Sequence, residues 1–131
     1  MRVGFILIAL ALSCFALSPT ARADDDRGNG NTSEGNEALF SLTTGIDNTA
    51  NGEQALFSNT TGSLNTATGY EALEFNTTGI DNTATGIGAL SGNPTGNSNT
   101  ADGANALHNN TTGADNTAIG GDALHNSEAP S

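Results

Sequence analysis

Positive charge is scarce in this 131-residue chain, which has no lysine and no tryptophan. Three arginines stand against 14 acidic residues, for a formal net charge of -11. A protein that binds nucleic acid neutralises phosphates with lysine and arginine, so a nucleic-acid partner is excluded. Attraction to anionic lipid head groups is disfavoured for the same reason. Only one cysteine is present, so no disulfide can form within the chain.

The N-terminal segment has the order of a secretory signal peptide. Met1-Arg2 precedes an apolar stretch from Val3 to Leu17, and Ala21-Arg22-Ala23 follows as an A-x-A cleavage site. The 15 residues of the apolar stretch fall short of the roughly 20 that span a bilayer. We therefore expect cleavage after Ala23, no membrane insertion of the product, and location outside the cell, at the cell surface or in the periplasm. A lipoprotein anchored at Cys14 is the alternative, and Ala11-Leu12-Ser13 matches its usual leucine-led motif poorly.

An internal repeat of 17 residues dominates the remainder. Glycine recurs at this spacing, and each glycine is followed three and four residues later by Ala-Leu. A second glycine column and the triplet Asn-Thr-Ala recur at the same spacing. The first glycines of the repeats are Gly35, Gly52, Gly69, Gly86, Gly103 and Gly120.

Such an uninterrupted period predicts stacked coils, because every column of equivalent residues then stays in register. We expect an all-β fold, a parallel β-solenoid of about five to six coils, over residues 35–126. Residues 1–23 would be the signal peptide, 24–34 a flexible acidic leader and 127–131 a C-terminal tail. Disorder is the alternative for a chain this rich in Gly, Asn and Thr, but it would not hold such a register.

Each column of the 17-residue repeat has residues that suit a particular position in a coil. Glycine at a corner allows positive φ or a close backbone approach. Stacked asparagines can bridge neighbouring coils through their side-chain amides, and threonines of the Thr-Thr-Gly segments suit turns. Asn-Thr-Ala-x-Gly is then a short strand. The asparagines of that strand column are Asn48, Asn65, Asn82, Asn99 and Asn116, and the turn threonines are Thr44, Thr61, Thr78, Thr95 and Thr112.

The predicted core is thin, with one leucine and two alanines per coil. Adjacent strand residues point to opposite faces, so Ala or Leu of each Ala-Leu pair should face outward and form an apolar interface between subunits. One helical turn in this arc remains an alternative, because Tyr70 to Phe75 contains good helix formers. The predicted core residues are Leu39, Leu56, Leu73, Leu90, Leu107, Leu124, Ala50, Ala67, Ala84, Ala101 and Ala118.

The segments Asn65-Thr66-Ala67-Thr68-Gly69 and Asn116-Thr117-Ala118-Ile119-Gly120 resemble the YadA-like head repeats of trimeric autotransporter adhesins. The resemblance covers Gly35 to about Asn126. It implies a left-handed parallel β-roll, three chains around one axis, and attachment to a host or matrix surface. The usual head repeat is shorter, so the Thr-Thr-Gly turn lengthens one corner here. Stalk and membrane-anchor segments of that family have no counterpart in this sequence.

Candidate chemistry is sparse. His108 and His125 share a column and would approach within about 5 Å, but two ligands do not complete a zinc site, so we expect an exposed polar column. Asp47, Asp81 and Asp115 are two coils apart, too far to share calcium. Triad, zinc-protease and phosphate-loop motifs are absent from the sequence. We therefore expect no enzyme activity, no cofactor and no bound metal.

Asparagines in Asn-x-Ser/Thr sequences match glycosylation acceptors. They arise from the repeat itself, so unmodified asparagines within the ladders are the favoured interpretation. These positions are Asn31, Asn59, Asn76, Asn109 and Asn110.

An uninterrupted threonine column supports a different function. Flat Thr-x-Thr ladders on solenoids resemble ice-binding surfaces, although the second ladder is broken here by Asn51, Asp102 and Ile119. The sequence thus favours a secreted, adhesin-like surface-binding module that forms a homo-oligomer, with ice binding as the alternative. The candidate ladder consists of Thr49, Thr66, Thr83, Thr100 and Thr117.

The signal peptide gives the first testable prediction. The secreted product should begin at Asp24 and contain no cysteine, because Cys14 lies in the removed segment. Intact-mass spectrometry of protein collected after secretion checks this. A product that retains Cys14 with an attached lipid would contradict it.

Overall fold

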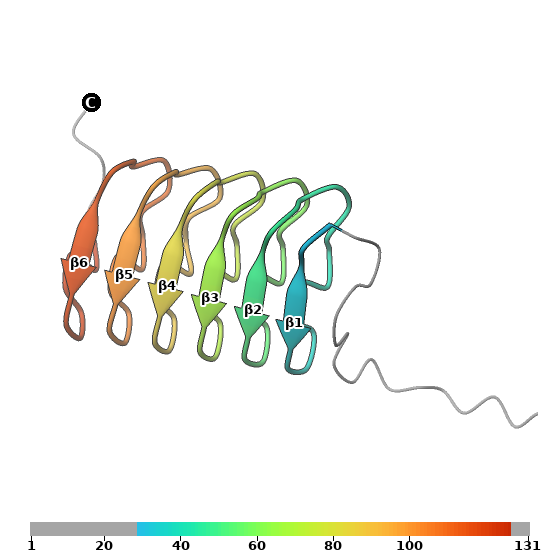
Figure 1. Ribbon diagram of the computed structural model, residues 1–131. Helices are drawn as coiled ribbons and strands as arrows, with labels where there is room; N and C mark the ends of the chain where they lie inside the picture. The colour runs from blue at the N-terminus through green and yellow to red at the C-terminus, as the bar shows by residue number, and fades with distance from the viewer. Residues whose placement is uncertain (1–28, 127–131) are drawn as a thin grey trace, which may run out of the picture.

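The computed structural model describes residues 29–126 as a stack of coils, each contributing one short strand to a parallel sheet (Figure 1). The described part contains only β-strands and turns, and neighbouring strands in the sheet follow one another in sequence. This confirms the predicted parallel β-solenoid of 17-residue coils. The strands are β1 (Thr32–Glu34), β2 (Thr49–Asn51), β3 (Thr66–Thr68), β4 (Thr83–Thr85), β5 (Thr100–Asp102) and β6 (Thr117–Ile119).

The predicted signal peptide, residues 24–28 of the predicted leader, and the predicted tail lie outside the described residues. Within residues 29–126, no helix is long and apolar enough to cross a membrane. The flexible leader predicted for residues 24–34 is wrong for Thr32–Glu34, which form β1 and pair with β2. Ser33 there occupies the buried alanine position of the later coils, so the repeat begins before its first glycine.

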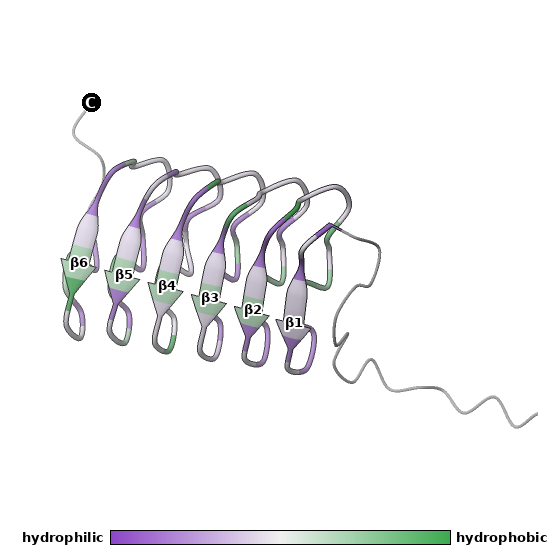
Figure 2. Ribbon diagram, in the orientation of Figure 1, coloured by the Kyte–Doolittle hydropathy of each residue, from purple (hydrophilic) through white to green (hydrophobic). Residues whose placement is uncertain are grey.

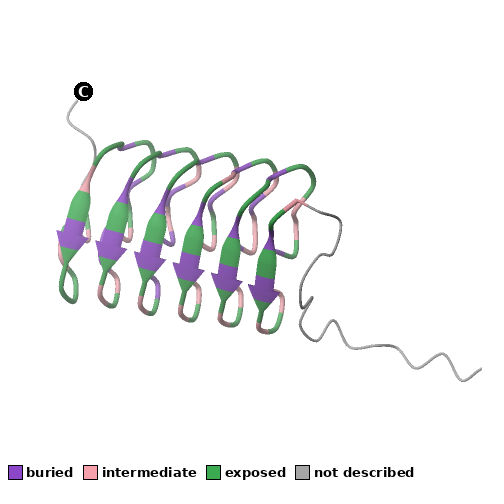
Figure 3. Cartoon of the chain, in the orientation of Figure 1, coloured by how far each residue is buried: buried purple, intermediate pink, exposed green. Residues whose placement is uncertain are grey.

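Each strand alternates exposed, buried, exposed (Figure 3). Threonine stands at the first position, where a β-branched side chain suits an exposed strand residue. Alanine stands at the second and points inward. Strands pair in strict register, as in Thr66 with Thr83 and Ala67 with Ala84. A shift of one residue would turn the alanines to the solvent, so burial of the small side chain fixes the register.

The Gly-x-x-Ala-Leu arc is neither a strand nor a helix. In the second coil Gln54 and Leu56 both have left-handed backbone, with φ of 59° and 52°, and Ala55 lies between them. The Ala55 and Phe57 N–H groups donate within the arc, to the carbonyls of Gly52 and Gln54, whereas the Leu56 N–H donates to Ala72 of the next coil. The arc is therefore a run of turns, and its alternate backbone N–H groups donate hydrogen bonds to adjacent coils.

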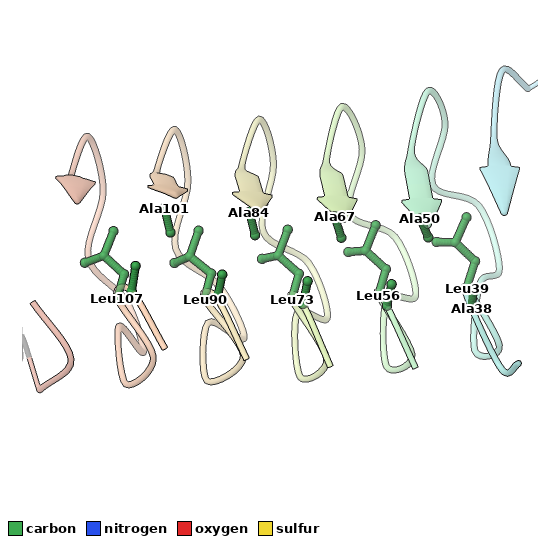
Figure 4. Close-up of a cluster of buried hydrophobic side chains, with 14 of the residues drawn as sticks. Ala38, Leu39, Ala50, Leu56, Ala67, Leu73, Ala84, Leu90, Ala101 and Leu107 are labelled. Carbon is green, nitrogen blue, oxygen red and sulfur yellow. The ribbon is translucent and has the colours of Figure 1, made fainter. Parts of the chain in front are cut away.

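This backbone corrects the prediction of an outward apolar column. Because the conformation alternates, Ala55 and Leu56 are both fully buried, and so are their counterparts Ala72 and Leu73. Figure 4 shows Leu56 and Leu73 among the buried side chains. The two-residue alternation of a strand does not apply to left-handed turn residues. Exposed apolar side chains occur elsewhere, and Figure 2 shows the strongly apolar loop segments scattered over different coils.

One apolar column forms the core, as the sequence predicted, except at its C-terminal end. The interior leucines Leu56, Leu73, Leu90 and Leu107 have no exposed surface, and Leu39 is 3% exposed. Leu124, also predicted as core, is 51% exposed, because no described coil follows it. The predicted alanines of the strands, Ala50, Ala67, Ala84, Ala101 and Ala118, are all buried.

The two glycine columns have different causes. Gly52 has φ of 141°, a conformation that residues with a Cβ rarely adopt. Gly62 has no such dihedral, but a Cβ there would collide with the Asn59 side chain and the Gly79 carbonyl. A Cβ at Gly52 would also collide with the Gly69 carbonyl, so the first column needs both positive φ and space, whereas the second needs space alone.

Two ladders of buried asparagines run along the stack. In the first, predicted from the sequence, the backbone N–H and Nδ2 of Asn82 donate to Oδ1 of Asn65, both at 3.1 Å. Asn82 Nδ2 also donates to the Gly96 carbonyl at 2.9 Å, and its Oδ1 accepts two bonds from Asn99. Every polar atom of this fully buried amide is therefore satisfied, as the interior requires.

The second ladder contains Asn59, Asn76 and Asn110, which were expected from the sequence to lie unmodified within ladders. Asn76 Nδ2 donates to Asn59 Oδ1 at 2.9 Å and to the Gly79 carbonyl at 3.2 Å. The same carbonyl accepts a bond from Asn65 of the first ladder at 2.8 Å. Each shared glycine carbonyl thus joins the two ladders. The members of the second ladder are Asn59, Asn76, Asn93 and Asn110.

The leucine column generates the second prediction. Replacing Leu73 by Asp should lower the free energy of unfolding by at least about 4 kcal/mol, because it removes a central buried side chain and buries a carboxylate. Chemical denaturation followed by circular dichroism measures this. Asp81→Asn is the control and should change little, since asparagine also tolerates the left-handed backbone at this exposed turn. A Leu73→Asp variant as stable as the parent would contradict the core assignment.

The first ladder generates the third prediction. Asn82→Ala should lower the free energy of unfolding by about 4 kcal/mol, because it removes four buried hydrogen bonds and leaves the backbone N–H of Asn99 without its acceptor. The same denaturation assay applies. Asn51→Ala is the control, because Asn51 is exposed. Equal stability of the two variants would show that the ladder is not a main source of stability.

Candidate binding surface

The outer face of the sheet is a regular surface. Its first column contains threonine in every strand, and each of these side chains is exposed, whereas the intervening alanine or serine is buried (Figure 3). The candidate ladder predicted from the sequence is therefore exposed and in register throughout, and β1 extends it by one residue. The column consists of Thr32, Thr49, Thr66, Thr83, Thr100 and Thr117.

A second column on the same face is mixed. Thr68 of β3 pairs with Thr85 of β4, which places a two-by-two array of exposed threonines at the centre of the sheet. Towards the ends this column carries Glu34, Asp102 and Ile119. Asn51 borders the array on the β2 side and Asp102 on the β5 side, so no carboxylate interrupts it.

Two more threonine columns follow the arc, and the structure separates their roles. Thr60 Oγ1 donates to the Thr77 carbonyl of the next coil at 3.0 Å, and Thr77 Oγ1 donates to Pro94 at 2.8 Å. Their neighbours Thr61 and Thr78 are exposed. The first column of the Thr-Thr-Gly segments thus links coils, and the second faces the solvent.

Aromatic rings stack between coils on another side of the molecule. Phe40 and Phe57 lie parallel with centroids 5.4 Å apart. His108 and His125 lie in the same column at 5.0 Å, as their spacing predicted. Each histidine Nδ1 lies close to the Oδ1 of the asparagine that follows it, at 3.0 and 3.1 Å. Among residues 29–126, no group of three or more His, Cys, Asp or Glu side chains is placed to hold a metal ion.

The acidic residues have local explanations. Asp47, Asp81 and Asp115 occupy a turn position with φ between 55° and 60°, which aspartate tolerates better than most residues. Partial burial, together with the charge of Glu71, raises the pKa of the Glu74 carboxyl above its usual range. A hydrogen bond with Glu71 raises the pKa of Tyr70.

Most asparagines in glycosylation sequences are inaccessible. Asn59 and Asn76 have no exposed surface, Asn110 is 1% exposed and Asn31 is 2% exposed. Their amides contribute to the ladders, so the folded chain offers no room for a glycan there. Asn109 is exposed, and its Nδ2 donates to Asn126 Oδ1 at 2.8 Å. The interpretation of these sites as parts of the repeat is confirmed for the buried four.

Comparisons of the chain with protein-family models, curated proteins and solved structures found no match. The similarity to YadA-like head repeats therefore stays a prediction from the sequence.

Proposed function

We propose that this chain is a secreted, non-catalytic module that binds extended surfaces in the manner of an adhesin, and that the threonine column of the sheet is its binding face. The observation that carries this proposal is the unbroken, in-register column of exposed threonines on β1 to β6.

The repetition of this face suits a large, regular partner. Successive strands place one threonine every ~4.8 Å, so an extended surface meets the same methyl and hydroxyl group at each step. Individual contacts of this kind are weak, but they add when all form at once. A small ligand would contact only one or two coils. The repeated geometry supports surface attachment better than binding of a small molecule.

We include a homo-oligomer in this proposal; a laterally associated trimer is the form that the adhesin resemblance implies. The apolar interface that we expected from the arc does not exist, because both its residues are buried. The apolar side chains available for such an interface include Ile46 and Ile80, which share a column and are 48% and 44% exposed. Ser63 lies between them in that column, so this patch is discontinuous.

A second candidate surface is ice. The specific observation in its favour is the central array of Thr66, Thr68, Thr83 and Thr85. It places threonines at ~4.8 Å between strands and at ~7 Å along each strand, a small two-dimensional lattice. Such an array of equivalent hydroxyls and methyls can order water in a repeating pattern, and the carboxylates of Glu34 and Asp102 lie outside it.

The fourth prediction tests the face. Thr83→Lys should reduce binding at least tenfold, or about 1.4 kcal/mol, because a long charged side chain prevents flat contact. Adsorption of labelled protein to immobilised polysaccharides and matrix proteins tests the adhesive function. Crystal shape in supercooled solution tests ice binding, for which the parent should give faceted crystals and Thr83→Lys round ones.

Thr78→Lys is the matched control, since Thr78 is an exposed threonine in the preceding turn. It should bind like the parent. Equal loss in both variants would show that the sheet face is not the binding surface. Round ice crystals in the parent would remove the ice candidate, and absence of adsorption to every coated surface would remove the adhesive one.

A further inference from the structure

The two ends of the solenoid present complementary halves of the contact that joins its coils. At each internal step the leading threonine N–H of a strand donates to the next coil, as Thr100 does to the Asn116 carbonyl at 2.8 Å. In the opposite direction Gly120 N–H donates to the Asp102 carbonyl at 2.7 Å. The first ladder adds two bonds, from the N–H and Nδ2 of Asn116 to Asn99 Oδ1, both at 3.1 Å.

The C-terminal face repeats these groups without a following strand in the described part of the chain. Thr117 N–H, Ile119 C=O and Asn116 Oδ1 occupy the positions that make the bonds at every earlier step. Leu124 is 51% exposed here, whereas Leu107 one coil earlier is fully buried. Asn110, which is 1% exposed, ends the second ladder, and its Oδ1 has no hydrogen-bond partner within residues 29–126.

The N-terminal face carries donors and an acceptor that match the hydrogen-bonding groups of the C-terminal face. Asn31 and Gly35 flank β1, at the positions that Asn116 and Gly120 hold around β6. Asn31 Nδ2 donates to the Gly45 carbonyl at 2.8 Å. The equivalent Nδ2 of Asn48 makes that type of bond and a second one to the preceding ladder member. A preceding coil would therefore supply Asn31 with the acceptor that Asn48 already has.

We propose that the protein assembles head to tail with a second copy of itself, β1 of one molecule pairing in parallel with β6 of another. The junction would reproduce the internal step, with Thr117 N–H donating to the partner copy's Asn31 carbonyl and both amide groups of Asn31 donating to Asn116 Oδ1. An exposed strand edge is a template for such pairing. Because the contact joins two different faces, it does not close and produces linear chains.

Repulsion between negative charges opposes this assembly and makes it depend on salt concentration. The chain carries a net charge of -11, and both ends are acidic, with Glu34 and Glu37 at one end and Asp115 and Asp122 at the other. Repulsion between exposed charges is screened at higher ionic strength. Assembly should therefore increase with salt, whereas a contact built on opposite charges would weaken.

The test is sedimentation velocity of the protein purified after secretion, over a hundredfold range of concentration and at two salt concentrations. The parent should show a mass that grows with concentration and with salt. Thr117→Pro should stay at the monomer mass, because proline removes the outward N–H at β6. Thr117→Val is the matched control: it keeps the N–H, loses the same hydroxyl, and should assemble like the parent.

A mixing experiment tests the polarity of the contact. Asn31→Asp blocks the other end by placing a carboxylate opposite Asn116 Oδ1, while its oxygen still accepts the bonds from Asn48. Neither Asn31→Asp nor Thr117→Pro should assemble alone, but each keeps one intact end. An equimolar mixture should therefore form dimers and nothing larger.

Three results would overturn the proposal. One is a parent that remains monomeric at every concentration. Another is a trimer whose mass does not depend on concentration and that persists in Thr117→Pro, which would indicate lateral association of the adhesin-head kind. The third is a parent that assembles only after residues 127–131 are deleted, which would show that the chain's own C-terminal residues cover the face.

Discussion

The side-chain amide of asparagine is the group on which this structure depends. Two asparagines per coil occupy the interior, where most proteins of this size place large apolar side chains. A buried amide is costly unless all its donors and acceptors are paired, and stacking identical coils pairs each one with its own copy. The thin apolar column of leucine and alanine is therefore only part of the core. The remainder is a continuous hydrogen-bond network that includes the glycine carbonyls.

This constraint explains why the repeat tolerates no insertion. Each asparagine bonds to the residue 17 positions away, so one added residue would break both ladders in that coil. It also explains the left-handed leucines. Leu73, at φ of 52°, turns its side chain inward beside Ala72, which no extended strand would allow. The backbone strain of that conformation is offset by full burial and by the hydrogen bond that the Leu73 N–H donates to the Ala89 carbonyl of the next coil.

Periodicity alone predicted the parallel solenoid, the strands at Asn-Thr-Ala, the first asparagine ladder and the exposed threonines. It failed in the arc, because the alternation rule assumes extended backbone and the sequence gives no direct sign of alternating left-handed turns. The second ladder was predicted only indirectly, because the asparagines of the Asn-x-Ser/Thr sequences were interpreted as unmodified ladder residues without their partners being assigned, and Leu42 stands in this column in the first coil. Its signal was present in the identical spacing of Asn59, Asn76, Asn93 and Asn110. The beginning of the solenoid was missed because β1 precedes the first repeated glycine.

Hydrogen exchange of the asparagine side-chain amides, measured by nuclear magnetic resonance on nitrogen-labelled protein, tests the ladder account most directly. The account predicts that the Nδ2 protons of Asn65, Asn82 and Asn76 exchange as slowly as the backbone amides of β3 and β4. Those of the exposed Asn51 and Asn97 should exchange rapidly. Fast exchange at all five side chains in the folded protein would contradict the claim that amide ladders hold the coils together.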